Sequence, residues 1–183
     1  LYGKKLLQPL ALVGIQGNEA DEYGISDPGP AGTTGSKADK YHSFVINELY
    51  PFIKKKTIIR KFRSIAICCN SLAGLSAFDI AWENADKLDT IGIFSGNFNY
   101  GANDALEKIS SSRKRPRLQY WLYAAENNDS TILNNTKELI AIIERKNPGY
   151  SAGIQFICDK TGNNDFASWR PHFPAFRFWA FGK

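Results

Sequence analysis

Methionine is absent from the 183-residue sequence, which begins at Leu1, so we expect the first part of the protein to lie outside it. No stretch approaches the roughly 18 uninterrupted apolar residues of a membrane-spanning helix, so we predict no membrane partner. Histidine is almost as scarce, because only His42 and His172 occur. This scarcity limits the side chains that could act as a general base near neutral pH.

Cysteine occurs only three times. Cys68 and Cys69 are adjacent and Cys158 is alone, so their spacing fits neither disulfide pairs nor a Cys-x-x-Cys metal site. All three lie in apolar runs, and we expect buried, unreactive thiols. The sequence therefore predicts no metal ion and no other cofactor.

Positive charges exceed negative charges by five, and the excess comes from two local clusters. One cluster contains Lys54, Lys55, Lys56, Arg60, Lys61 and Arg63, and the other contains Arg113, Lys114, Arg115 and Arg117. We interpret both clusters as solvated ends of secondary-structure elements, with a phosphate- or polyanion-binding patch as the alternative. Nucleic acid is accordingly not the expected partner.

Short apolar runs alternate with amphipathic stretches along the chain. The runs predict strands at residues 10–15, 64–69, 90–94, 118–124 and 154–158. Helical spacing of apolar residues predicts helices at 37–55, 72–84 and 104–110, after residue 129, and in an aromatic segment near 169–179. Continuous apolar strands separated by helices indicate an α/β fold with a mostly parallel sheet covered on both faces. We expect residues 1–183 to form a single domain.

Polar residues follow the predicted strands, at the sheet edge where open α/β folds bind ligands. These stretches begin at Gly17 and continue at residues 70–71, 95–99, 125–129 and 159–165. The turn at Ser71 is the shortest, and a serine in a tight strand-to-helix turn is exposed beside helix amides that can stabilise an oxyanion. Small residues, Cys69 and Ala73, stand where such turns usually have glycine. The alternative is a serine that only caps the helix.

Six stretches occur in the order and spacing of one enzyme family. They are Val13-Gly14-Ile15, Glu22-Tyr23-Gly24, YHSFVINELYPFI at 41–53, NSLAGLSAFDIAW at 70–82, GIFSGN at 92–97 and WRPHFPAFRFWAF at 169–181. Together they resemble the esterase D and enterochelin esterase-like group of the α/β-hydrolase superfamily, which includes feruloyl and acetyl xylan esterases. The resemblance implies an α/β-hydrolase-like three-layer sandwich whose N-terminal strands are missing from this sequence.

The resemblance also implies hydrolysis of carboxylic esters through a Ser, Asp or Glu, His triad in that chain order. It places the nucleophile at Ser71 and one oxyanion donor at the backbone N–H of Leu72. The acid position falls on Asn128, and Asp129 could replace it only if the loop is displaced. The histidine position falls on Asn164.

An asparagine at the histidine position cannot accept the serine proton, because its amide nitrogen does not titrate near neutral pH. His42 is interpreted as a boundary residue of its helix, and His172 is not expected to reach Ser71. Two hypotheses follow from this set of residues. One is a weakly active serine esterase acting on a small-molecule ester or a carbohydrate-linked acyl group. The other is a non-catalytic homologue that binds a carbohydrate, a siderophore-like ligand or a protein in the same cleft.

Overall fold

A computed structural model describes residues 9–17, 22–24, 36–57, 61–98, 105–127, 130–149 and 153–182. Its sheet contains four parallel strands in chain order: β1 (Ala66–Asn70), β2 (Thr90–Phe94), β3 (Gln119–Ala125) and β4 (Ile154–Asp159). The helices between the strands are α3 (Ser71–Glu83), α4 (Ala105–Ser111) and α5 (Ser130–Lys146). The predicted parallel α/β fold is confirmed for these residues.

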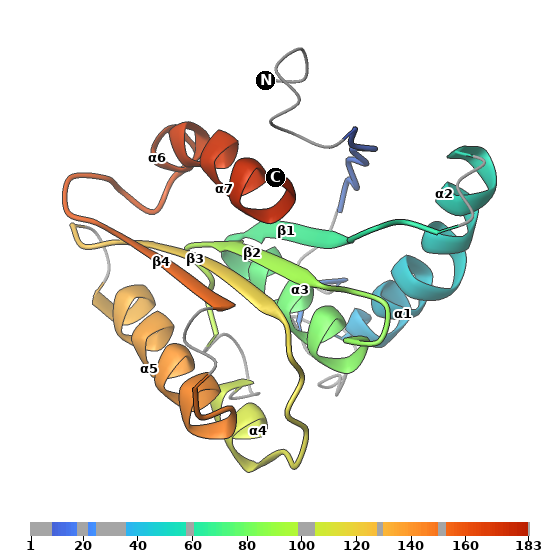
Figure 1. Ribbon diagram of the computed structural model, residues 1–183. Helices are drawn as coiled ribbons and strands as arrows, with labels where there is room; N and C mark the ends of the chain where they lie inside the picture. The colour runs from blue at the N-terminus through green and yellow to red at the C-terminus, as the bar shows by residue number, and fades with distance from the viewer. Residues whose placement is uncertain are drawn as a thin grey trace.

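The sheet is the middle of three layers (Figure 1). Helices α3, α4 and α5 cover one face, and α6 (Phe166–Trp169) and α7 (Phe173–Phe181) cover the other. Alternate residues of each strand point to opposite faces, so a strand between two helical layers is apolar at successive positions. The five residues of β2 are accordingly all buried.

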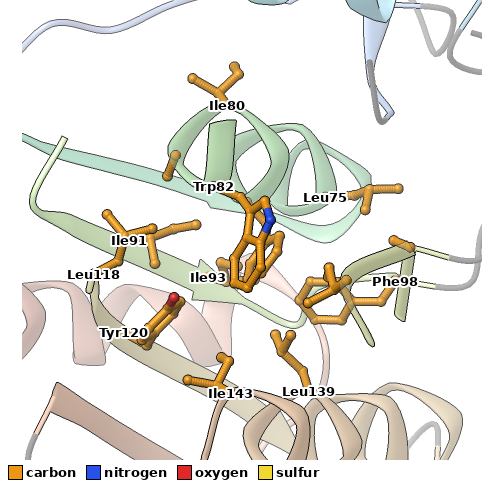
Figure 2. Close-up of a cluster of buried hydrophobic side chains, with 14 of the residues drawn as sticks. Leu75, Ile80, Trp82, Ile91, Ile93, Phe98, Leu118, Tyr120, Leu139 and Ile143 are labelled. Carbon is orange, nitrogen blue, oxygen red and sulfur yellow. The ribbon is translucent and has the colours of Figure 1, made fainter. Parts of the chain in front are cut away.

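The larger apolar core lies between the sheet and α3, α4 and α5. Figure 2 shows side chains from α3, including Leu75 and Trp82, meeting Ile93 of β2 and Leu139 of α5. A second core, on the other face, is aromatic: Phe94 and Trp121 from the sheet contact Phe176 of α7, and Tyr123 stacks on Phe94. Fully burying one such large side chain contributes about 1.5 to 3 kcal/mol. The two cores therefore hold the helices against both faces of the sheet.

The strand predicted at residues 10–15 is wrong. The structure describes this segment as irregular chain, with the Leu12 side chain 80% exposed and the Val13 side chain 43% exposed. A strand is stabilised by pairing and by burial of at least one face, and an apolar run by itself provides neither. Within the described residues, β1 therefore forms one edge of the sheet and β4 the other.

The helix predicted at residues 37–55 is present, but it is not uniform. It consists of α1 (Ala38–Ser43), the π-helical turn η2 (Phe44–Leu49) and α2 (Tyr50–Thr57). A π-helical turn takes more residues per turn than an α-helix, so it rotates the apolar face that the sequence spacing predicts. Val45 and Ile46 are buried, whereas α2 has no buried residue and its Phe52 side chain is 55% exposed.

The prediction of three buried cysteines is wrong for one of them. Cys68 and Cys69 of β1 are partly buried, and burial raises the pKa of both thiols, that of Cys69 to about 12. Cys158 is exposed. It lies on the edge strand β4, most of whose residues are only half-buried, whereas an apolar sequence run predicts burial on both faces.

Candidate active site

The turn between β1 and α3 holds Ser71 in an unusual backbone conformation. Asn70 is extended (φ −130°, ψ 163°), and Ser71, the first residue of α3, has φ +48°. A left-handed backbone at a non-glycine residue costs about 1–3 kcal/mol and occurs most often at functional sites. Ser71 is also exposed. The turn therefore presents the serine to solvent at the carboxyl edge of the sheet, as the sequence predicts.

The N-cap of α3 is Asn70 rather than Ser71, and no side chain caps the helix. The backbone N–H groups of the first turn, including that of Leu72, have no partner within a helix. A serine that only caps the helix, the alternative that the sequence left open, does not fit this geometry. Helix amides in the first turn are well placed to bind negative charge that develops next to Ser71.

Glycine at position 74 allows α3 to lie close to β2. A Cβ atom at Gly74 would be 2.9 Å from Cγ2 of Ile93 and 3.4 Å from the Cα of Gly96. The Asn97 N–H donates a hydrogen bond to the Ser71 carbonyl oxygen over 3.3 Å. Together, these contacts connect the first turn of α3 to the residues that follow β2.

A second serine with a left-handed backbone follows the neighbouring strand. Asn70 pairs with Phe94 in the sheet, so the next residues, Ser71 and Ser95, follow adjacent strands. Ser95 has φ +55° and is buried, and its N–H donates to the Tyr123 carbonyl oxygen over 2.8 Å. In the sequence, Ser95 stands out by its place after a predicted strand and by the GIFSGN stretch at 92–97, and neither gives it a role.

Asn164, at the position that the resemblance assigns to the histidine, is held in a hydrogen-bond network. Its Oδ1 accepts hydrogen bonds from Ser95 Oγ over 2.6 Å and from the Ala125 N–H over 3.2 Å. Trp169 Nε1 donates to the same Ser95 hydroxyl over 2.9 Å. Because the Ala125 N–H can only donate, the side-chain atom facing it is the oxygen, which determines the orientation of the amide. The structure therefore brings Asn164 next to Ser95, one strand from Ser71.

His172 lies beside the carboxylate of Asp159 and not beside Ser71. Its Nε2 lies 3.6 Å from Oδ2 of Asp159, and its ring centroid is 4.9 Å from that of Tyr123. Asp159 ends β4, three strands from β1, and adjacent strands are about 4.8 Å apart. Among the described residues, no hydrogen bond joins an imidazole to Ser71.

Asp159 is strongly stabilised in its charged form. The backbone N–H of Thr161 and the Tyr123 hydroxyl donate hydrogen bonds to its carboxylate over 3.0 and 2.8 Å, and Gly162 N–H donates a further one. These bonds hold the pKa of the Asp159 carboxyl well below its usual range. Burial, followed by the hydrogen bond to Asp159, raises the pKa of Tyr123. The sequence does not distinguish Tyr123, because a tyrosine inside a strand has the pattern of a core residue.

The other histidine, His42, is buried against α3. Its Nδ1 lies 3.4 Å from Oδ2 of Asp79, and Lys108 Nζ lies 3.2 Å from Oδ1 of the same carboxylate. His42 is only 7% exposed, so its interpretation as a boundary residue is wrong. The buried carboxylate of Asp79, which faces it from α3, is the physical reason, because a buried polar side chain needs a hydrogen-bonding partner.

The predicted acid positions, Asn128 and Asp129, lie outside the described residues. Glu126, just before them, is exposed, and its backbone N–H donates to the Asp159 carbonyl oxygen over 2.9 Å. Within the described ranges, no group of three or more His, Cys, Asp or Glu side chains is arranged to hold a metal ion. None of the helices described here has the length and hydrophobicity needed to span a membrane.

A shallow cavity of about 240 Å³ lies apart from this turn, between α1 and the irregular segment before it. Tyr41 and Phe44 line it together with Glu22, Lys37 and Lys40, and neither Ser71 nor Asn164 is among the lining residues. The chemically distinctive groups therefore lie at the carboxyl edge of the sheet and not in this cavity.

Comparison with known proteins identifies the family. Residues 2–178 match the family described as "Putative esterase", and the chain belongs to this family of ester hydrolases. No curated protein matches the chain. The fold, with its serine at the strand-to-helix turn, agrees with this assignment.

Several solved structures have the same fold. The enterobactin esterase FES from Shigella flexneri superposes with a TM-score of 0.66 and 19% identity over 82% of this chain and 42% of its own. The BES protein from Bacillus cereus gives a TM-score of 0.64 and 18% identity over 91% of this chain and 69% of its own. The siderophore hydrolase EstB from Aspergillus nidulans gives a TM-score of 0.59 and 10% identity over 88% of this chain and 65% of its own. The chain spans about two fifths of the length of the enterobactin esterase, and these similarities establish the α/β fold.

Proposed function

We propose that residues 1–183 form a single esterase-like domain that hydrolyses carboxylic esters weakly, with Ser71 as the nucleophile. The observation that supports this function best is the left-handed backbone of an exposed serine between β1 and α3. Strained backbone of this kind clusters at functional sites, and Ser71, unlike Ser95, is exposed.

Ser71 Oγ attacks the ester carbonyl carbon, and the carbonyl oxygen becomes an oxyanion that the Leu72 N–H stabilises. The C–O bond to the alcohol then breaks, leaving an acyl group on Ser71, and water releases the acid. The small-molecule ester or carbohydrate-linked acyl group would lie at the carboxyl edge of the sheet, beside Ser71 and Asn97.

The low activity follows from the partners of the two histidines and of Asn164. His42 and His172 lie against Asp79 and Asp159, and the oxygen of Asn164 accepts two hydrogen bonds. The serine proton therefore passes to water or to the leaving group. An enzyme that loses its triad base retains only the contributions of binding and of the oxyanion donors, which are about 10³ to 10⁴-fold over water.

The pairing of both histidines with carboxylates also favours a second candidate, a homologue that binds its ligand without hydrolysing it. Its ligand would be a carbohydrate, a siderophore-like molecule or a protein that binds the surface next to Ser71. Both candidates use the same surface, but only the first requires the Ser71 hydroxyl.

Hydrolysis of p-nitrophenyl acetate by the full chain and by its Ser71→Ala variant separates the two candidates. For the esterase, we expect the variant to lose the protein-dependent rate while its thermal unfolding midpoint changes little. Ser76→Ala is not a suitable control, because that hydroxyl accepts a hydrogen bond from the Gly24 N–H. Ser110→Ala is the matched control, because Ser110 is exposed on α4 and the hydrogen bond that its hydroxyl accepts from Arg145 Nη2 over 3.1 Å is also exposed, unlike the buried bond at Ser76. Equal rates for the wild type and Ser71→Ala would reject the esterase and favour the binding protein.

A further inference from the structure

The side-chain oxygen of Asn164 has hydrogen-bond partners, whereas its side-chain nitrogen has none among the described residues. Oδ1 accepts two hydrogen bonds, from Ser95 and Ala125. Nδ2 is buried and has no hydrogen-bond partner among the described residues. An unpaired buried donor costs about 1–3 kcal/mol, so the folded chain retains this group at a measurable loss of stability. A cost of this kind is expected where a ligand supplies the missing acceptor.

The position of the free donor relates it to the serine. Ser71 and Ser95 follow adjacent strands, whose backbones are about 4.8 Å apart. The amide of Asn164 accepts hydrogen bonds from Ser95 Oγ over 2.6 Å and from the Ala125 N–H over 3.2 Å, so it lies at the carboxyl ends of β2 and β3, and β2 is next to the strand that Ser71 follows. A group bound on Ser71 that extends along this edge toward Ser95 would approach the amide.

The orientation of the amide is determined by two independent donors. The Ala125 N–H and the Ser95 hydroxyl both face Oδ1, and the Trp169 N–H holds the Ser95 hydroxyl from its other side. A reversal of the amide would place an NH₂ group against the Ala125 N–H, which is unfavourable because both groups only donate. Nδ2 is therefore a preorganised donor rather than a freely rotating one.

We propose that Nδ2 of Asn164 donates a hydrogen bond to an oxygen of the group bound at Ser71. This inference rests on the proposed role of Ser71. The amide selects ligands that place a hydrogen-bond-accepting oxygen there, such as an ester or sugar oxygen, over those with an N–H or a methyl group. It stabilises the ligand without moving a proton, so Asn164 is a specificity-determining residue and not a base.

Phenylboronic acid is a suitable test ligand, because its boron bonds to a serine oxygen. In that reaction the Ser71 O–H bond breaks, its proton goes to solvent, and an O–B bond forms, which leaves a tetrahedral boronate with two hydroxyl groups. Titration calorimetry of the full chain measures its affinity, and ¹¹B NMR detects the tetrahedral boron. Ser71→Ala should eliminate the tetrahedral signal.

Asn164→Asp is the sharpest variant. A carboxylate can still accept the hydrogen bonds from Ser95 and Ala125, but it has no N–H to donate. We expect boronate binding to weaken about tenfold or more, since the lost hydrogen bond goes to an oxygen of an anionic boronate. Asn127→Asp adds the same charge at an exposed position and should weaken binding less than about threefold under salt screening.

A second measurement uses the unaltered protein and does not depend on the folding of a variant. In a sample with ¹⁵N-labelled asparagine, the side-chain N–H signals of Asn164 should shift when the boronate binds. Unchanged affinity in Asn164→Asp, or unshifted Asn164 signals while the Ser71 adduct forms, overturns this inference alone. Equal binding by the wild type and Ser71→Ala rejects the proposed nucleophile, and the role of Asn164 with it.

Discussion

The side-chain oxygen of Asn164 accepts a hydrogen bond from the Ser95 hydroxyl over 2.6 Å. These residues are 69 positions apart in the sequence and meet at the carboxyl edge of the sheet. Asn164 is thus a structural connection between the segment after β4 and the end of β2. The residue at the position that the resemblance assigns to the base therefore links two parts of the fold.

Replacement of Asn164 by histidine should increase esterase activity. Asn164→His introduces a nitrogen that titrates near neutral pH, and a general base contributes about 10²- to 10⁴-fold to such reactions. We expect the rate of p-nitrophenyl acetate hydrolysis to rise at least about tenfold, because geometry and the asparagine that the resemblance places at the acid position limit the gain. Adding Asn128→Asp should increase it further. The increase should vanish in the double variant that combines Asn164→His and Ser71→Ala. An unchanged rate in the single variant Asn164→His would contradict the prediction.

The hydroxyl of Ser95 should contribute to stability independently of its backbone. Ser95→Ala removes the hydrogen bonds to Asn164 and Trp169, and we expect the free energy of unfolding to fall by about 2 kcal/mol. Ser95→Gly removes the same bonds but tolerates φ +55°, so it should be more stable than Ser95→Ala by roughly 0.5–1 kcal/mol. Urea unfolding measures both variants. A less stable glycine variant would argue against backbone strain at this position.

The charge of Asp159 should make stability depend on acid pH. Hydrogen bonds in the folded protein lower the pKa of this carboxyl, so its contribution is present above the unfolded-state pKa of about 3.9 and is lost as pH falls below that value. Asp159→Asn should therefore be less stable than the wild type at pH 7, with a difference that shrinks below about pH 4. Urea unfolding midpoints between pH 2 and 7 provide the measurement. A difference that is constant with pH would show that charge is not involved.

The close approach of α3 to β2 should make Gly74 sensitive to a single methyl group. Gly74→Ala would place Cβ 2.9 Å from Cγ2 of Ile93, a core side chain that is 1% exposed. Alanine favours a helix by about 1 kcal/mol over glycine, whereas overpacking a core costs about 1–3 kcal/mol. We expect a net loss of stability in thermal unfolding. A gain would mean that the helix moves away from β2 at little cost.

Most of the fold could be predicted from local patterns. The apolar runs at 90–94 and 154–158 predict β2 and β4 to within a residue. Burial between two helical layers explains the continuous apolar run of β2, whereas β4 is an edge strand whose residues are mostly half-buried. The run at 10–15 has the same local character but is irregular and exposed. Hydrophobicity over six residues cannot report whether a partner strand is available, so this error could not be avoided from the sequence.

Local sequence patterns predict one residue of the candidate site but not its long-range hydrogen bonds. Ser71 could be found because a strand, a tight turn and a helix are consecutive in the sequence. The roles of Ser95 and Tyr123 could not, because their partners, Asn164 and Asp159, are 69 and 36 positions away. A hydrogen bond between distant segments depends on strand order and register, which only the folded sheet defines.

The sequence by itself determined the parallel α/β class, the family and the serine at the β1–α3 turn, since these follow from residue types and their local order. Only the tertiary structure decided what surrounds that serine. In the folded chain, His42 lies beside Asp79 and His172 beside Asp159. The side-chain oxygen of Asn164 accepts hydrogen bonds from Ser95, which follows β2, and from Ala125, which ends β3. The physical reason is that a polar side chain acquires its role from the partner that packing brings within about 3 Å, and packing is a property of the whole fold.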